Sequence, residues 1–466
     1  MERNAHPATR ARRLNPLLLG EVLGVFAVAA VFAVFATLTA PAGAADLLQT
    51  YRDAISNDAS YASARATRDA GLETLAQGRA LILPTVNATA FTQMNNSEIS
   101  FRGAFPDSNR QGNTNGYTIT LTQPLFNWAS FMTYKEASYK VAQAEATFGQ
   151  AQQDLIVRVS QAYFDVLAAQ DSLAFLQAQR TAISEQLAQA KRNFEVGTAT
   201  ITDTHEAQAR FDLSVSQGIA AENDLEIKKR ALQQIIGTLP QGLTPLRSAL
   251  QLAPPQPSAM EQWVQSAEQQ SFSVRVQEAA LEVATREIER LRAGHYPSLN
   301  LVGVVGANSA SLATAGIANT ATDSNSRSIG LQLSIPIYAG GNVSSLVRQA
   351  IALQEKSRQD LESARRTAAL SSRQSFLGVT NGMAQVRALE AALISSQSAL
   401  DSNKLGYEVG VRINIDVLNA QQQLFSTKRD LSKARYDTLM NGLKLKAAAG
   451  SLNEEDVAAV NRLLGD

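Results

Sequence analysis

The chain contains the stretch Phe194-Glu-Val-Gly-Thr-Ala-Thr-Ile-Thr-Asp203 and, 213 residues later, the stretch Tyr407-Glu-Val-Gly-Val-Arg-Ile-Asn-Ile-Asp416. Each stretch has an aromatic residue, Glu-Val-Gly and an aspartate in the same order. Glycine commonly follows the last turn of a helix in the left-handed conformation, so Gly197 and Gly410 each predict a helix end. A second helix is predicted to begin near each aspartate. The two stretches therefore indicate two similar helical hairpins.

The same spacing recurs elsewhere, which indicates that a whole unit is duplicated. Arg79-Ala-Leu-Ile-Leu-Pro84 resembles Arg292-Ala-Gly-His-Tyr-Pro297, again 213 residues later. Solenoid repeats have periods of about 20–50 residues, so this is a different kind of repeat. We predict an internal two-fold repeat, with residues 45–254 as the first unit and residues 255–466 as the second.

Each unit is predicted to contain very long helices. Between Trp128 and Phe194 the sequence has no proline and one glycine, Gly149; a continuous helix there would be roughly 100 Å long. The apolar residues of this stretch recur at alternating intervals of four and three: Leu155, Val159, Ala162, Val166, Ala169, Leu173 and Leu176. This period of 3.5 residues is typical of coiled coils. Returning helices are predicted over about 203–236 and 416–449, and a further helix over 46–80.

Strands are predicted between the helices of each unit. Tyr117, Ile119 and Leu121 alternate with threonines, and a longer series of alternating apolar residues comprises Ile329, Leu331, Leu333, Ile335 and Ile337. Strict alternation indicates a strand with one apolar face. The glycine- and asparagine-rich segments 103–116 and 308–326 are predicted to be exposed loops at hairpin ends. Each unit thus contributes one hairpin, with strands of about ten to thirteen residues.

The N-terminus and the composition limit where the protein works. Residues 1–44 combine several arginines, an apolar run over 22–39 and Ala42-Gly-Ala44, which is the pattern of a cleaved signal peptide. A membrane anchor is the alternative, because the run nears a spanning length. The 466 residues include 42 basic and 42 acidic side chains and no cysteine. This balance gives no basic footprint for nucleic acid, and the missing cysteine excludes disulfides, thiolate metal sites and a lipidated N-terminal cysteine.

The strands limit the possible assemblies. A sheet that spans a lipid bilayer has to close, because open edges leave backbone groups unpaired. Four strands are too few, since known barrels begin at about eight. If the strands span a membrane, several chains must therefore share one barrel. The alternative is a small soluble β-domain at the end of an ordinary coiled coil.

With these features, the chain resembles the TolC family of outer-membrane channel-tunnels. The resemblance runs from about residue 46 to the end and is carried by short segments in the same order. They are Asp46-Leu-Leu-Gln-Thr-Tyr51, the two glycine-centred stretches above, Ala434-Arg-Tyr436 and Gly450-Ser-Leu-Asn-Glu-Glu-Asp456. The resemblance implies an α+β membrane protein. In it, a trimeric 12-stranded outer-membrane β-barrel would be continuous with a 12-helix periplasmic α-barrel. Residues 239–258 and 450–466 would form an equatorial collar.

The resemblance also implies roles at the helical tips, which would close the periplasmic end. Tyr407 would bond Asp203 within one chain, Arg412 would reach Thr202 or Asp203 of the neighbouring chain, and Gln186 would join this closed-state latch. From the residues alone, Asp203 and Asp416 could simply cap helices, because aspartate is a favoured N-cap.

The pore entrance and the contact with an adaptor are implied in the same way. Asp416 matches the first of the family's two entrance aspartates, whereas the second falls on Asn419, so this chain departs from the pattern. The expected adaptor contacts are Val196, Gly197, Thr198, Val409, Gly410 and Val411. Helix termination alone would also explain the glycines.

These inferences lead to one main functional hypothesis. The chain would be a passive exit duct in the outer membrane, without catalytic residues, cofactor or metal, for tripartite efflux, type I protein secretion or both. A periplasmic membrane-fusion adaptor and an inner-membrane ABC or RND transporter would open it and supply the energy, because the sequence has no phosphate-binding motif. The alternative is a structural or adhesive trimeric coiled-coil surface protein.

Overall fold

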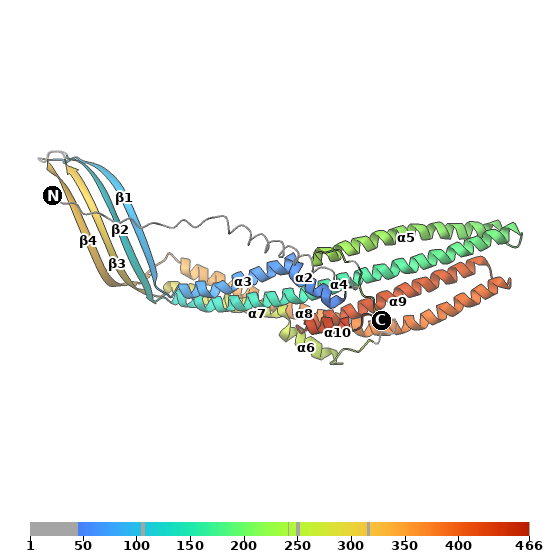
Figure 1. The fold of residues 1–466 in the computed structure, drawn as a ribbon. Coiled ribbons are helices and arrows are strands. Elements are labelled where there is room, and N and C mark those ends of the chain that lie inside the picture. The colour runs from blue at the N-terminus through green and yellow to red at the C-terminus, as the bar shows by residue number, and fades with distance from the viewer. Residues whose placement is uncertain (1–44, 104–107, 241, 248–251, 315–316, 466) are drawn as a thin grey trace, which may run out of the picture.

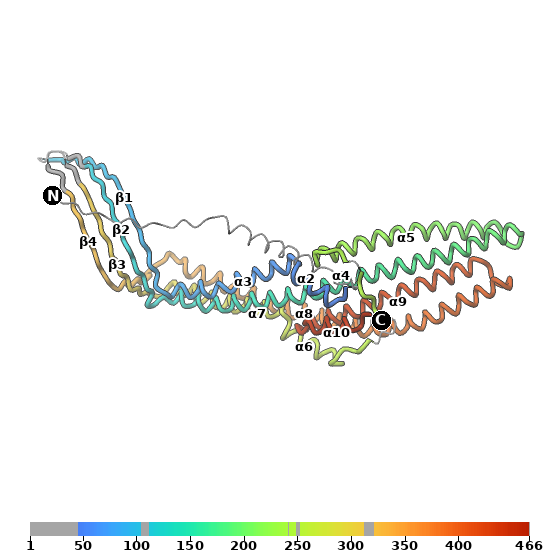
Figure 2. Tube along the Cα trace, in the orientation of Figure 1, coloured from blue at the N-terminus to red at the C-terminus, as the bar shows by residue number. Residues whose placement is uncertain are grey.

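The computed structural model describes residues 45–103, 108–240, 242–247, 252–314 and 317–465. The expected signal peptide lies outside these residues. The molecule is elongated, with a β-sheet at one end and the tips of two helical hairpins at the other (Figure 1). The Cα trace shows the same arrangement, in which both hairpins point away from the sheet (Figure 2).

The elements follow the same order in the two halves of the chain. The first half contains α2 (Leu47–Asn57), α3 (Ala59–Ala80), β1 (Thr85–Ile99), β2 (Ser108–Phe126), α4 (Trp128–Glu195) and α5 (Ile201–Ile236). The second half contains α6 (Met260–Gln270), α7 (Phe272–Arg292), the 3-10 turn η1 (Ala293–His295), β3 (Ser298–Thr314), β4 (Ile317–Ser334), α8 (Asn342–Glu408), α9 (Asn414–Ala448) and α10 (Glu454–Asn461). Among the described residues, no helix is apolar and long enough to cross a membrane.

The sheet has four antiparallel strands in the order β1-β2-β3-β4. The two predicted hairpins are therefore present, and they also pair with each other through β2 and β3. The strands have 15 to 19 residues and are longer than expected. The prediction of loops over 103–116 and 308–326 is wrong for most of these segments, because β2, β3 and β4 continue through them. These segments form strands although glycine, asparagine and aspartate disfavour them, because cross-strand hydrogen bonds to the neighbouring strands satisfy the backbone.

In the half of the sheet next to the helices, one face is largely apolar across all four strands and is interrupted by Gln123 and Arg327. The register pairs Val86 with Leu121, Leu121 with Gly303, and Gly303 with Ile329. The apolar side chains on this face are Val86, Ala88, Ala90, Tyr117, Ile119, Leu121, Leu299, Leu301, Val305, Ile329, Leu331 and Leu333. Nothing in the described chain covers this face, and Ile329 is 78% exposed. The outer edges of β1 and β4 have no strand partner within the sheet.

The long helices form as their sequence pattern predicts. α4 runs unbroken for 68 residues and α8 for 67, and each turns back at a glycine with a positive φ, 77° at Gly197 and 76° at Gly410. The expected helix over 46–80 is divided into α2 and α3 at Asp58. The Asp58 side chain accepts a hydrogen bond from the Tyr61 backbone N–H at 2.6 Å and thereby caps α3.

Asp58 also ties α3 to α4 through an ion pair. Its two carboxylate oxygens accept hydrogen bonds from the Arg158 guanidinium, each at 3.1 Å. Burial opposes ionisation of this carboxyl, but the Arg158 and Tyr61 hydrogen bonds and the Arg158 charge outweigh it. They hold the pKa of Asp58 below its usual range. The break between α2 and α3 is therefore fixed by a charged cap rather than by proline or glycine.

The largest apolar cluster lies about halfway along α4. It joins α4 to α2, α5, α9 and α10 and includes Leu47, Leu155, Tyr163, Phe164, Leu232, Met440 and Val457. The two ends of the described chain meet here, because Asn461 donates to the Asp46 carboxylate at 2.9 Å. A single β-bridge links Leu246 with Leu464 nearby. The segments expected to form the collar are thus in contact, although residues 248–251 lie outside the described part.

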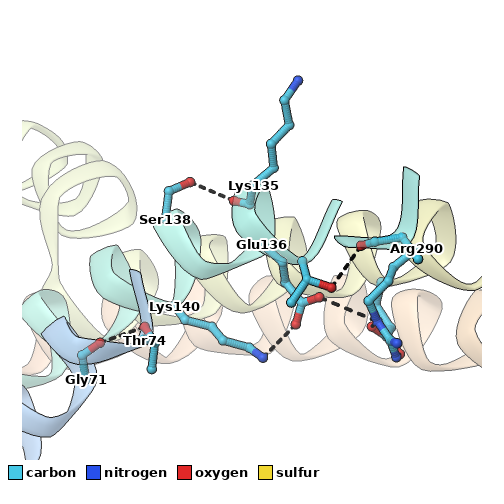
Figure 3. A network of polar contacts seen from close by, with 10 residues as sticks. Gly71, Thr74, Lys135, Glu136, Ser138, Lys140 and Arg290 are labelled. Atoms are coloured by element: carbon cyan, nitrogen blue, oxygen red, sulfur yellow. Dashed lines mark hydrogen bonds and ion pairs between the residues drawn. The ribbon is translucent and has the colours of Figure 1, made fainter. Parts of the chain in front are cut away.

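Closer to the sheet, a buried carboxylate joins α4 to α7. Glu136 is 5% exposed and pairs with Lys140 on its own helix at 2.7 Å and with Arg290 of α7 at 3.9 Å. Figure 3 shows the Lys140 and Arg290 side chains pointing toward Glu136, whereas Lys135 points away. Glu287 also accepts a hydrogen bond from Nε of Arg290, at 2.6 Å. The buried Glu136 carboxylate is therefore balanced by two cationic side chains, because an unpaired charge would be costly to bury.

α4 and α7 also approach each other closely at Gly149. A Cβ atom built on this residue would lie 2.3 Å from Cε1 of Phe272 on α7. The single glycine of α4 therefore makes room for an aromatic ring of the second half of the chain.

We expect Gly149→Ala to destabilise the protein by about 1–3 kcal/mol through overpacking, despite the higher helix propensity of alanine. Gly218→Ala on α5 is the matched control, because nothing lies within 4 Å of a Cβ there; it should be neutral or stabilise by up to about 1 kcal/mol. Denaturant midpoints of the helical circular dichroism signal compare the two. Equal midpoint shifts would contradict the close approach.

Candidate functional site

The two helical tips have the same backbone geometry. In the first, the N–H of Gly197 donates to Phe194 O at 3.0 Å and the N–H of Thr198 donates to Asn193 O at 2.8 Å. The second repeats this pattern with equivalent residues around Gly410. Both glycines therefore end helices, which is the simpler of the two roles that the sequence allowed.

The tips also present an unusual apolar surface. Val196, Val409 and Val411 are 73%, 65% and 78% exposed. These are three of the six residues for which the sequence predicted contact with an adaptor, and helix termination does not require valine at any of them.

Asp203 lies in the first turn of α5, but it is not the N-cap. The cap is Thr200, and Asp203 is the third helical residue, whose carboxylate accepts from the Thr200 backbone N–H at 3.0 Å and from its hydroxyl at 2.8 Å. This reciprocal arrangement is a capping box. The sequence suggested Asp203 as the N-cap of α5. The structure has the cap in the same turn but on Thr200.

Asp416 has the equivalent place in α9 but a different environment. The residue before α9 is Ile413, which has no side chain that could cap the helix. The Asp416 carboxylate is instead 3.7 Å from the Arg412 guanidinium. The expectation that Asp416 caps α9 is therefore wrong, and its charge stays at the surface of the tip beside Arg412.

The structure gives Tyr407 a partner other than the expected one. Its hydroxyl accepts a hydrogen bond from the Asn193 side-chain amide at 3.1 Å. The predicted bond between Tyr407 and Asp203 is not formed in the described chain, where Asp203 Oδ2 accepts from Thr200 instead. Asn193 was missed by the sequence analysis, and its counterpart in the second half is Gly406. The contacts of Arg412 with Thr202 or Asp203 of a neighbouring chain remain predictions.

Gln186 belongs to the tip network through a residue that sequence reasoning missed. Its side-chain amide donates to Asn414 Oδ1 at 2.5 Å, and the Asn414 amide reaches the backbone oxygen of Asp203 at 3.4 Å. Gln186 is 7% and Asn414 1% exposed. Asn414 thus connects α4, α5 and α9 in a buried site. The only signal was its mismatch with Ile201, the equivalent residue of the first half.

Asn419 follows Asp416 by three residues on α9, so the two lie on one face of the helix. Asn419 is exposed, and its Oδ1 accepts a hydrogen bond from Arg210 of α5 at 3.1 Å. Arg210 also donates to Gln422 at 2.5 Å and lines a cleft of about 360 Å³ between α4, α5 and α9. No cluster of metal-ligating side chains occurs in the part of the chain that the structure describes.

Comparison with known proteins explains this combination of sheet, long hairpins and tips. The sequence model of the family described as outer membrane efflux protein matches twice, over residues 50–238 and 263–451. The chain belongs to the outer membrane efflux protein family. As a member it is an outer-membrane protein and an export channel rather than an enzyme.

Individual relatives of the family agree in sequence and in fold. The outer membrane protein TolC of Vibrio cholerae is 35% identical, over 97% of this chain and 98% of its own. The proteases secretion protein PrtF of Dickeya chrysanthemi is 32% identical, over 89% of this chain and 90% of its own. The crystal structure of the Campylobacter jejuni outer membrane channel CmeC has the same fold, with a TM-score of 0.76 and 17% identity over 90% of each chain.

In this family member, the Gln186–Asn414 contact should hold the tips in place. We expect Gln186→Leu to leave the Asn414 amide buried without its partner and to cost about 1–3 kcal/mol of local stability. Hydrogen–deuterium exchange at residues 408–418 should then accelerate by about fivefold to 150-fold. Adding Asn414→Leu should restore part of the loss. Gln397→Leu is the control, because Gln397 makes only an exposed contact with Asp401; exchange rates equal to this control would refute the role of Gln186.

Proposed function

We propose that the chain is the protomer of a trimeric exit duct, in which three copies share a 12-stranded β-barrel continuous with a 12-helix α-barrel. The observation that carries this proposal is the sheet. Next to the helices it has a largely apolar face that crosses all four strands, and within the described chain its two outer edges have no strand partner. Open edges are intolerable in lipid, and three sheets of four strands joined edge to edge would remove them. The polar face would line a water-filled channel.

The division of the chain into two repeats is part of this proposal. Residues 45–254 and 255–466 would form the two units after removal of a signal peptide over 1–44. The identical order of helix, strand pair and helical hairpin supports the division. So does the match of one family model to two separate stretches, 50–238 and 263–451. Three chains would then place six similar units around one axis.

The helical tips would form the closed periplasmic end. The Gln186–Asn414 contact would act within each chain, and Arg412 would act between chains on Thr202 or Asp203. The exposed residues Val196, Gly197, Thr198, Val409, Gly410 and Val411 would contact a periplasmic membrane-fusion adaptor, because apolar surface at a tip gains free energy when a partner covers it.

The partners would be an inner-membrane ABC or RND transporter together with that adaptor. PrtF and the alkaline protease secretion protein AprF are named for protein secretion, and both are 32% identical to this chain. This favours type I secretion, while the family description favours efflux. The duct itself would be passive and would need neither cofactor nor metal.

The lipid-facing role of the sheet can be tested with neighbouring residues of β4. Ile329→Arg would place a charge on the apolar face, at a cost of up to about 2–4 kcal/mol near the bilayer midplane, and should greatly lower the yield of membrane-inserted trimer. Ser328→Arg is the matched control on the opposite face and should insert and conduct.

The measurements are trimer mass in detergent and single-channel conductance in a planar bilayer. An adhesive coiled-coil protein would give no conductance with the unaltered chain. Equal insertion of the two variants would contradict the proposed barrel.

The pore entrance would carry one ring of carboxylates from Asp416 and one ring of amides from Asn419. Carboxylate rings favour cations in a pore. We therefore expect the unaltered chain to be less cation-selective than a channel with a six-carboxylate entrance. The Asn419→Asp variant should be more cation-selective than the unaltered chain. Reversal potentials in asymmetric KCl measure this, and identical values for the two proteins would refute the assignment.

A further inference from the structure

Arg210 reaches from the first helical hairpin to the second. Its Nη1 donates to Gln422 Oε1 at 2.5 Å and its Nη2 donates to Asn419 Oδ1 at 3.1 Å. Both acceptors are neutral amides on α9. Among the residues that the structure describes, no carboxylate forms an ion pair with Arg210. The guanidinium is therefore held in a fixed place by hydrogen bonds to neutral acceptors rather than by an ion pair.

The neighbouring charges on α9 are arranged differently. Asp416 lies three residues before Asn419 and pairs with Arg412 at 3.7 Å. The second hairpin thus brings the Arg412–Asp416 pair to this part of the tip, whereas Arg210 lies one turn after Glu206 on α5. Arg412 offsets Asp416, whereas Arg210 adds a positive charge at the amide of Asn419. The position is particular to the first hairpin, because the equivalent residue of the second is Gln423.

We propose that Arg210 is a selectivity-determining residue of the pore entrance. This inference rests on the proposed function, in which Asn419 lines the entrance. Rings of arginine or lysine in a pore favour anions, whereas rings of carboxylates favour cations. In the second ring, Asn419 already replaces a carboxylate and so lowers the permeability of small cations. Three copies of Arg210 would lower that permeability further. The amides of Asn419 and Gln422 hold the three guanidinium groups at the pore wall.

The contact has a consequence for substitutions at Asn419. A carboxylate placed there by Asn419→Asp would lie against the Arg210 guanidinium and form a charge-assisted hydrogen bond with it. Much of the new negative charge would then be neutralised locally. The gain in cation selectivity from Asn419→Asp should consequently be measurable while Arg210 is present but clearly larger once Arg210 is removed.

The experiment measures reversal potentials of the full-length trimer in planar bilayers under a KCl gradient. The set comprises the unaltered chain, Arg210→Gln, Asn419→Asp and the double variant. We expect Arg210→Gln to raise the ratio of potassium to chloride permeability at least about twofold, and the double variant to exceed the product of the two single effects. An unchanged ratio in Arg210→Gln, or strictly multiplicative effects, would overturn the proposal.

Two controls separate charge from packing and from position. Arg210→Lys keeps the charge and should keep the selectivity of the unaltered chain. Arg230→Gln removes an exposed arginine on the same helix that also donates to a neutral amide, that of Gln233, but it lies roughly 30 Å further along α5. It should change nothing.

Failure of this inference and failure of the proposed function give different results. An unaltered chain that does not conduct refutes the duct. A channel that conducts but keeps its permeability ratio in Arg210→Gln refutes only the role of Arg210. If Arg210→Gln does not assemble, Arg210→Met retains the length of the aliphatic stem and should give the same increase in the permeability ratio. An Arg210→Met channel with the original ratio would count against the role of Arg210.

Discussion

The constraint on which the rest of the structure depends is the hydrogen bonding of the outer strands. β1 and β4 each pair on one side only, so a row of backbone N–H and C=O groups is left along both edges of the sheet. In water such edges invite aggregation, and in lipid they are not tolerated. In the proposed barrel, a chain with this sheet is therefore incomplete as a monomer. Only one residue separates β2 from α4. The position of β2 in the sheet therefore also sets where α4 begins.

The two halves of the chain are similar in fold but have diverged at their tips. The helix ends share the same glycine geometry, yet the polar contacts differ. Asn414 replaces the isoleucine found in the first half, and Asn193 replaces the glycine found in the second. The first tip closes its capping box within itself, whereas the second lacks a capping side chain and binds across to its neighbour. The two hairpins thus share a scaffold, and the residues in which they differ supply the specific contacts between them.

Most of the fold could be predicted from the sequence because its signals are periodic and long. The helices α4, α5 and α9 and the two glycine turns were located to within about two residues. The strand lengths were underestimated because small polar residues were taken as loop signals. In a sheet with a polar face, the same residues belong to strands. The break at Asp58 was also missed, since a single aspartate within a helical pattern is a weak signal.

The tips were harder to predict than the fold. Sequence position placed Gln186, Asp203, Tyr407 and Asp416 in the right turns, but hydrogen-bond partners depend on side-chain geometry across separate helices. Asn193, Asn414 and Arg210 have no motif of their own. A comparison of the two halves would have pointed to them, because each differs in character from its equivalent.

The uninterrupted length of α4 has a mechanical consequence. One helix extends from the sheet to the tip, and its most tightly packed section lies near its middle, among α2, α5, α9 and α10. A long stiff rod held near its centre behaves as a lever, so a slight change of tilt at the fulcrum becomes a much larger sideways movement at the free end. Substitutions in this central packing could therefore change how far the far end swings without altering any residue there.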